Sequence, residues 1–458
     1  MTRLDRGRAR TAITTAVLAL IIIVVLVVAG IGAYFLLTST STPTTTTVTS
    51  TGITTVTSTG ITTVTSTGIT TVTSTATVKS PIKVGLITEL SGPYASDGGL
   101  ITDGAQLAVS QINANGGVLG TTLQLIVQDE GSSTTSTVTA AQILVAQDGV
   151  SFLSGPFFSG DVSSELPFTN SHNVLQVLSV ASGNFLMVSP QNKLLYMVSF
   201  PDSGEAFVAE NFLLQVHATS AMYEAEDYQY THEDASFLAN FTAAHGINLI
   251  SSDFYPGDES DYSAAINKIA TTMPSAVVVG MSGVNGVDFM EQYLANPVTS
   301  KIPVEMVGGL LQNVAEVQTV DASVGGNGAN GVFLGYDFTI TNKTAALNSQ
   351  LETTYGIPAN EYSAQSYDAI QMLALAIQAA GSTNTTQVAN AFAAIHYFGP
   401  SGNYAFEPDH IGTLGVGFLT GNLEQLTVTG GSIHYSIVWP PNLANATAFN
   451  PSTGQPYS

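Results

Sequence analysis

Two serines that follow apolar segments, Ser159 and Ser182, have the clearest potential for binding chemistry in this 458-residue chain. Ser159 and Gly160 come shortly after the apolar segment 151–153, where a helix is expected to begin. A hydroxyl group beside unpaired backbone N–H groups can hold a carboxylate or another hydrogen-bond acceptor. Such a serine can equally well serve only as the cap of its helix. The residues therefore indicate either a small-ligand site or an ordinary helix start.

Catalytic and cofactor motifs give no support for an enzyme. The chain has no cysteine, which excludes thiolate nucleophiles, disulfides and thiolate metal sites, and its seven histidines are scattered without the spacing of metal ligands. Residues 326–331 read GNGANG, but an apparent strand follows instead of the helix that a dinucleotide site requires. No G-x-S-x-G motif is present. We expect a protein without catalytic residues, cofactor or metal.

Apolar segments alternate with helical segments from residue 81 onward. Strands are expected at 83–88, 123–127, 151–153, 174–178, 195–200, 220–223, 249–254, 276–280, 304–307 and 332–335. Helices are expected at 103–115, 137–146, 205–216, 232–244, 262–271 and 287–296. This alternation predicts an α/β fold with parallel sheets. Because one sheet of ten or more strands is improbable, we expect two lobes that close on a ligand at the carboxyl ends of their strands.

The N-terminal region predicts a membrane segment. Residues 13–37 contain no charge and are long enough to span a bilayer, and all four arginines of the chain lie within residues 1–10. The positive-inside rule places residues 1–12 in the cytoplasm and the rest outside the cell. A cleaved signal peptide is the alternative, although the apolar stretch is longer than usual and lacks an obvious cleavage site.

A linker dominated by threonine and serine follows at residues 38–80. Three tandem copies of TSTGITTV begin at Thr49, Thr57 and Thr65. With so few apolar groups this segment cannot bury a core, and we interpret it as a disordered tether that lifts the next domain from the membrane. A β-solenoid is the alternative, but three eight-residue units are too few for one.

Five motifs beyond the linker resemble, in order, the branched-chain amino-acid type of periplasmic binding protein that serves ABC importers. They are IKVGLITELSGPYASDGG from Ile82, DGAQLAVSQINANGGVLG from Asp103, LQLIVQDEGSS from Leu123, YSAQSYDAIQMLALAIQAAG from Tyr362 and FGPSGNYAFEPD from Phe398. The resemblance implies a two-lobed fold with ligand between the lobes. We expect one lobe at 81–200 and 335–400, the other at 201–334 and 401–440, and a tail at 441–458.

The same resemblance implies several ligand contacts. Ser159 and Ser182 match positions that hold the ligand carboxylate, and Tyr230, rather than Tyr228, matches a ligand-contacting tyrosine. Ser282 stands where the family often has a second tyrosine. Thr231 replaces the usual glycine after the tyrosine.

The position of the family's ammonium-binding acid departs from the pattern. Leu310 stands at that position, and Asp97 or Asp227 could substitute for the missing carboxylate. An ammonium group without a carboxylate partner is poorly held in a dry cleft, so the family's preference for leucine, isoleucine or valine does not transfer. The absence of arginine after residue 10 also argues against phosphate and dicarboxylate ligands. We expect a neutral or cationic small molecule, an amide or a peptide.

The charge distribution excludes one class of partner and suggests an environment. After Arg10 the chain has six lysines and 32 acidic residues, so it cannot neutralise a nucleic-acid backbone. This excess would repel itself at neutral pH but would be largely protonated in acid. We therefore expect an ectodomain that works outside an acid-loving cell.

Three functions remain open from the sequence. The first is a tethered solute-binding protein that delivers its ligand to an ABC permease and ATPase. The second is a receptor ectodomain that passes the ligand signal to a partner. The third is a surface adhesion or coat protein, which the stalk by itself would also suit.

Overall fold

The computed structural model describes residues 44–50, 70–76, 79–131, 133–311, 314–326, 328–336, 338–415 and 417–457. The chain divides into two compact units, Met1–Ser80 and Pro81–Ser458. The predicted cytoplasmic tip and membrane segment, residues 1–37, lie outside the described residues. Among the helices within these ranges, none is long and apolar enough to cross a membrane.

Two segments of the first unit form an antiparallel pair. Strand β1 (Thr44–Ser50) pairs with β2 (Thr70–Ala76), so that Thr44 lies opposite Ala76. These segments differ from the coil predicted for the linker. Threonine is branched at Cβ and favours extended backbone, which explains why these threonine-rich segments can adopt strands.

The second unit begins with a fully parallel sheet of five strands in the order β4-β3-β5-β6-β7. Its strands are β3 (Ile82–Thr88), β4 (Leu123–Asp129), β5 (Phe152–Ser154), β6 (Leu175–Leu178) and β7 (Leu195–Met197). Most of these residues are buried, which explains why the strands appear in the sequence as short apolar runs rather than as alternating patterns.

A second sheet has seven strands in the order β16-β15-β12-β11-β10-β8-β9. Its strands are β8 (Ser220–Glu226), β9 (Asn248–Tyr255), β10 (Ala276–Gly280), β11 (Val304–Val307), β12 (Phe333–Tyr336), β15 (Asn422–Thr429) and β16 (Ser432–Trp439). The first five are parallel, and β15 and β16 add an antiparallel hairpin at the β12 edge. In both sheets the strand that comes first in the chain lies between the second and the third: β3 lies between β4 and β5, and β8 lies between β9 and β10.

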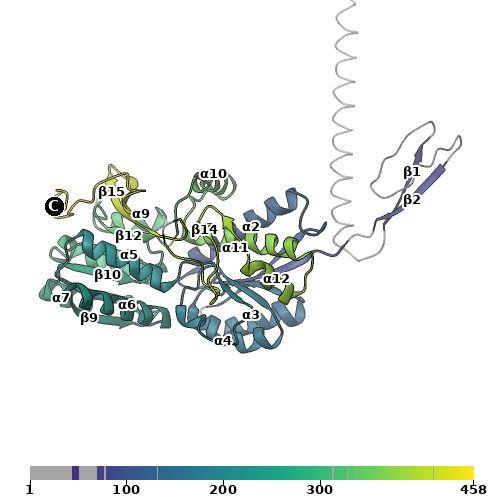
Figure 1. The fold of residues 1–458 in the computed structure, drawn as a ribbon. Helices are drawn as coiled ribbons and strands as arrows, with labels where there is room; N and C mark the ends of the chain where they lie inside the picture. The colour runs from purple at the N-terminus through teal and green to yellow at the C-terminus, as the bar shows by residue number, and fades with distance from the viewer. Residues whose placement is uncertain are drawn as a thin grey trace, which may run out of the picture. The chain divides into compact units, whose positions relative to one another are not determined.

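Helices cover the two sheets (Figure 1). They are α2 (Ala95–Ala114), α3 (Thr134–Gln142), α4 (Ser159–Ser171), α5 (Asp202–Gln215), α6 (Gln229–His245), α7 (Ser263–Thr272), α8 (Gly283–Ala295), α9 (Val314–Ser323), α10 (Thr344–Tyr355), α11 (Glu361–Ala380) and α12 (Thr385–Ala393). A π-helical turn, η1 (Ile143–Gln147), extends α3, and η2 (Asn184–Leu186) and η3 (Thr299–Lys301) are 3-10 turns. A short pair, β13 (Tyr397–Phe398) and β14 (Asn403–Tyr404), follows α12.

After β12 the chain returns to the first lobe, where it forms α11 and α12. Helix α11 packs along α2 and against α12, whereas α5 packs against α6 and β12. The chain therefore forms two α/β lobes, as the sequence predicted. Fully burying one leucine or valine side chain stabilises the fold by about 1.5–3 kcal/mol, and cores such as that around Val277, Met306 and Phe289 contain many of them.

The predicted strands and helices are confirmed, with three differences. Helix α2 begins at Ala95, eight residues before the predicted start, and Gly98 in its first turn approaches the Glu89 carbonyl too closely for any Cβ atom. Strand β12 crosses the predicted lobe boundary at residue 335 and lies wholly in the larger sheet. Helices α9, α10 and α12 and the pairs β13–β14 and β15–β16 were not among the predicted elements.

Candidate functional site

A cavity of about 40 Å³ lies between the two lobes, at the carboxyl ends of the strands. In open parallel sheets this edge collects ligand-binding loops where neighbouring strands lead off in opposite directions. Here those strands are β3 and β5 in one lobe and β8 and β10 in the other. The lining residues are Phe157, Phe158, Ser159, Val180, Ala181, Ser182, Phe200, Glu205, Tyr230, Ser282, Gly308, Glu361, Tyr362 and Gln365.

The loop after β5 places Ser159 at the first position of α4. The buried Glu130 carboxylate accepts a hydrogen bond from the backbone N–H of Phe157 at 2.8 Å. The Ser159 hydroxyl oxygen accepts the backbone N–H groups of Ser182 and Gly183 at 3.2 and 3.0 Å. These bonds join the loops after β5 and β6, and they leave the Ser159 proton to be donated to a ligand acceptor.

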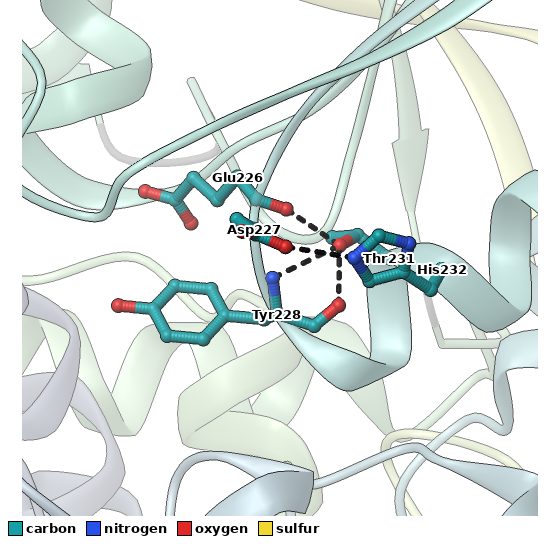
Figure 2. Close-up of polar contacts among 5 residues, drawn as sticks. All are labelled: Glu226, Asp227, Tyr228, Thr231 and His232. Carbon is teal, nitrogen blue, oxygen red and sulfur yellow. Dashed lines mark hydrogen bonds and ion pairs between the residues drawn. The ribbon is translucent and has the colours of Figure 1, made fainter.

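The first turn of α6, which follows β8, contributes Tyr230 from the opposite lobe. Thr231 is buried, and its hydroxyl oxygen lies 2.6 Å from the Glu226 carbonyl oxygen and 2.7 Å from that of Tyr228 (Figure 2). The same oxygen accepts the Tyr228 N–H at 3.3 Å. Threonine therefore fixes this turn through its side chain, which glycine at this position could not do.

Two carboxylic acids make the cavity acidic. Glu205 in the first turn of α5 and Glu361 at the start of α11 both line it. Burial and the nearby Glu361 carboxylate raise the pKa of Glu205, the Ser182 side chain lowers it, and the net result is a pKa of about 8. Among the described residues, no lysine or arginine lines the cavity. A positive charge brought close to these acids would lower their pKa values and favour their carboxylate forms.

A polar cluster closes the entrance beside this cavity. The Tyr94 hydroxyl, from the loop after β3, donates to Glu226 Oε1 at 2.8 Å and lies 3.3 Å from the Tyr228 hydroxyl. The Asn285 amide donates to both Tyr94 and Glu226, at 3.0 and 2.9 Å. The Tyr228 ring stacks on Phe158 with a centroid distance of 4.5 Å. These contacts join residues of both lobes.

Four predicted ligand residues, Ser159, Ser182, Tyr230 and Ser282, come together in the lining of the cavity. The other three predicted residues do not line it. They are placed as follows: Gly160 lies in the first turn of α4, Asp97 is buried in the first turn of α2, and Asp227 is 61% exposed and pairs with His232 at 2.7 Å.

Asp97 and Asp227 differ in their surroundings. Figure 2 shows the Asp227–His232 pair on the opposite side of the turn from the Tyr228 ring and the Glu226 carboxylate. Burial raises the pKa of Asp97 to about 7, and the charges of Glu361 and Glu226 add to this effect. Asp97 therefore belongs to the acidic surroundings of the cleft without lining the cavity.

Glu205 and Glu361 are functional candidates that sequence reasoning missed. The only local signal was an acid in the first turn of each helix, which is common because it complements the helix dipole. Leu310, at the place of the family's acid, is 2% exposed and packs on Gly286 within the core of the second lobe. The carboxylates of the cleft therefore come from other elements than the one that the motif indicated.

A larger hollow of about 690 Å³ lies elsewhere, among apolar residues such as Phe207, Leu414 and Trp439. Of the seven predicted ligand residues it contains none, and its residues come mostly from α5 and segments after residue 338. Of these two cavities, the smaller one lies where the strand ends and four of the predicted residues meet.

Comparisons with known proteins agree with this geometry. The family model for periplasmic binding proteins matches residues 81–420. A Leu/Ile/Val-binding protein of Rhizobium johnstonii is 25% identical over 309 residues, which cover 67% of this chain and 81% of that protein. A leucine-, isoleucine-, valine-, threonine- and alanine-binding protein of Pseudomonas aeruginosa is 24% identical and covers 71% and 86%.

Solved structures show the same fold. A solute-binding protein of an ABC transporter from R. palustris, in complex with benzoate, has a TM-score of 0.68 and 20% identity, and the match covers 79% of this chain and 97% of that one. A branched-chain amino acid transporter substrate-binding protein from Streptococcus pneumoniae, in complex with isoleucine, has a TM-score of 0.67 and 21% identity, and covers 79% and 100%. Proteins of this kind bind solutes and are not enzymes. With the family model covering most of its length, the chain belongs to the periplasmic binding protein family.

Proposed function

We propose that this protein captures a small amine-bearing solute between its lobes, outside the cytoplasm, and delivers it to an ABC importer. The observation that carries the proposal is the composition of the cavity between the lobes. Ser159 and Ser182 line the cavity with hydroxyl groups. Glu205 and Glu361 also line it, and they supply the acidic groups that this chain lacks at Leu310, the position of the family's acid. A zwitterion or an amine finds partners for its charges in such a site.

The apolar part of the ligand has partners too. Phe157, Phe158, Phe200, Tyr230 and Tyr362 line the cavity, and aromatic side chains provide large contact areas for an apolar body. The proposed ligand is therefore an amino acid or related amine with an aliphatic or aromatic side chain. Because about 40 Å³ is little more than the space of one water molecule, the lobes must separate before such a ligand can enter.

Calorimetric titration of the full-length chain in detergent tests the ligand class. Leucine, phenylalanine and phenylethylamine carry an ammonium group, and benzoate is a matched aromatic anion without one. We expect phenylalanine and phenylethylamine to bind at least about tenfold more tightly than benzoate, a difference of about 1.4 kcal/mol. Tighter binding of benzoate, or no binding of any of the four, would contradict the proposal.

Delivery to an importer and tethering by residues 13–37 are separate parts of the proposal. The family supports an importer, because its relatives include transporter components. Crosslinking the full-length chain in its own membranes, followed by identification of the crosslinked partners, tests this part. We expect a permease and its ATPase, whereas recovery of a signalling protein would favour the receptor function.

A further inference from the structure

Three buried carboxylates lie together behind the cavity. Asp202 and Glu205 occupy the first turn of α5, and Asp234 lies on the neighbouring helix α6. One carboxylate oxygen from each residue lies within 4.8 Å of the other two. Helices α5 and α6 pack against each other, which brings together acids that are far apart in the sequence.

The oxygen atoms of this acidic triad lack partners. Both oxygens of Asp202, both of Asp234 and one of Glu205 are buried without a hydrogen bond. None of the three carboxylates takes part in an ion pair within the part of the chain that the structure describes. A buried charge without compensation is strongly unfavourable, so the triad requires either protons or a cation.

Tyr223 provides an observation that is independent of the triad. This residue of β8 is 1% exposed, and its hydroxyl oxygen is also buried without a hydrogen-bond partner. Burial raises the pKa values of Tyr223 and Asp234, and a side-chain contact between the two residues lowers that of Asp234. The Tyr223 hydroxyl therefore lies beside Asp234, where it can supply a neutral oxygen ligand next to the three acidic ones.

We propose that Asp202, Glu205 and Asp234 form a binding site for a hard divalent cation, with Ca²⁺ as the best fit. Calcium takes oxygen ligands at about 2.3–2.6 Å, so two ligands on opposite sides of the ion lie about 4.8 Å apart. The three oxygens lie within 4.8 Å of one another, so a single ion of this size can contact all of them. Mg²⁺ requires shorter distances and a nearly octahedral set, which makes it the poorer candidate.

The cation would lie next to the solute. Glu205 belongs both to the triad and to the lining of the cavity, whereas Glu361 lines the cavity but is not part of the triad. A bound cation would neutralise Glu205, and Glu361 would remain as the partner of the ligand's ammonium group. Cation binding would also link α5 to α6 directly beneath the cleft.

Equilibrium dialysis and calorimetry with CaCl₂ alone test the site. The full-length chain in detergent is first freed of metal with a chelator and is studied at pH 7.5 without any solute, so the outcome does not depend on the proposed ligand. We expect one Ca²⁺ per chain and a rise of about 2 °C or more in melting temperature at saturation. Mg²⁺ should bind at least about tenfold more weakly.

Isosteric variants locate the site. Asp234→Asn and Asp202→Asn should each weaken Ca²⁺ binding at least about tenfold. Glu305→Gln is the matched control, because Glu305 is also fully buried in the second lobe with both oxygens unpartnered but lies outside the triad. Its Ca²⁺ affinity should equal that of the wild type.

Two results would overturn the proposal. The first is the absence of binding to the wild-type chain at about 10 mM Ca²⁺, above the range of protein calcium sites. This result does not depend on whether any variant folds, and it would mean that protons alone satisfy the triad. The second is unchanged Ca²⁺ affinity in both Asp234→Asn and Asp202→Asn.

Discussion

The hydroxyl group of Tyr94 donates a hydrogen bond of 2.8 Å to the carboxylate of Glu226, across 132 positions of the chain and from one lobe to the other. Tyr94 comes from the loop after β3, and Glu226 is the last residue of β8. The Asn285 amide supports both partners. Burial raises the pKa of Glu226 to about 7, and its hydrogen bonds to Asn285 and Tyr94 oppose that rise. The bond therefore favours the closed arrangement of the lobes.

Replacing Tyr94 by phenylalanine should shift the lobes toward the open arrangement. Loss of one buried hydrogen bond to a carboxylate costs about 1.5 kcal/mol, which corresponds to roughly tenfold weaker ligand binding. Calorimetry gives the affinity, and small-angle scattering reports the change in lobe separation. Tyr196→Phe is the control, because that hydroxyl bonds Ala389 O at 2.9 Å within one lobe. Equal effects of the two variants on affinity would contradict a role of Tyr94 in closure.

Ser159→Ala should weaken the binding of carboxylate-bearing ligands. The variant loses the proposed donor to the ligand and the acceptor for the N–H groups of Ser182 and Gly183. We expect a loss of about 1–2 kcal/mol in calorimetric titrations with phenylalanine. Phenylethylamine, which lacks the carboxylate, should be affected less. Ser164→Ala on the exposed face of the same helix is the control.

Glu361→Gln should reduce the preference for amines. Glu361 is 4% exposed and lines the cavity, so removing its charge removes the proposed partner of the ammonium group. We expect phenylethylamine to bind at least about tenfold more weakly, because hydrogen bonds between charged groups contribute about 1.5–3 kcal/mol. Glu352→Gln, on the exposed surface of α10, should leave the affinity unchanged. A variant that keeps its preference for phenylethylamine over benzoate would exclude Glu361 from this role.

Stability should fall as the pH rises from about 4 to 8. Burial raises the pKa of Glu226 and Asp368 to about 7 and that of Glu424 to about 8, whereas unfolded glutamate and aspartate titrate near 4. The folded state therefore binds more protons than the unfolded state within this window, and each group removes up to about 1.4 kcal/mol per pH unit from the free energy of unfolding. Urea unfolding in the presence of a chelator measures this slope.

Glu424→Gln provides a control for the pH dependence. Burial is the cause of the raised pKa of Glu424, so the neutral amide should make the decline of stability with pH less steep. Glu352→Gln should leave the slope unchanged, since that side chain is exposed. A wild-type stability maximum above pH 7 would contradict this prediction. It would also contradict the expectation that the protein works in an acidic medium outside the cell.

Asp227→Asn should leave solute binding unchanged. The sequence indicated Asp227 as one possible replacement for the acid missing at Leu310, but its side chain is 61% exposed and pairs with His232 away from the cavity. We expect the same affinity for phenylalanine as in the wild type, within the error of calorimetry. A tenfold loss would show that Asp227 reaches the ligand when the lobes open.

Much of the fold could be predicted from the sequence, because local patterns encode it. Short apolar runs separated by helical segments predicted the strands from β3 to β11 and the parallel sheets, since strands buried on both faces need apolar side chains throughout. The same runs placed Ser159 after a strand, where parallel sheets bind ligands, and the family resemblance added Ser182 and Ser282. The early start of α2 could not be predicted, since it depends on how closely Gly98 approaches Glu89.

The acidity of the site was decided only by the tertiary structure. Glu205 and Glu361 are ordinary first-turn acids in their own helices, and nothing in the neighbouring residues marks them. They meet because α5 packs in one lobe and α11 in the other, and both helices begin at the cleft. The raised pKa of Glu205 follows from burial, which arises only when the lobes assemble. The sequence thus determined which elements form, and packing between distant segments determined which charges face one another.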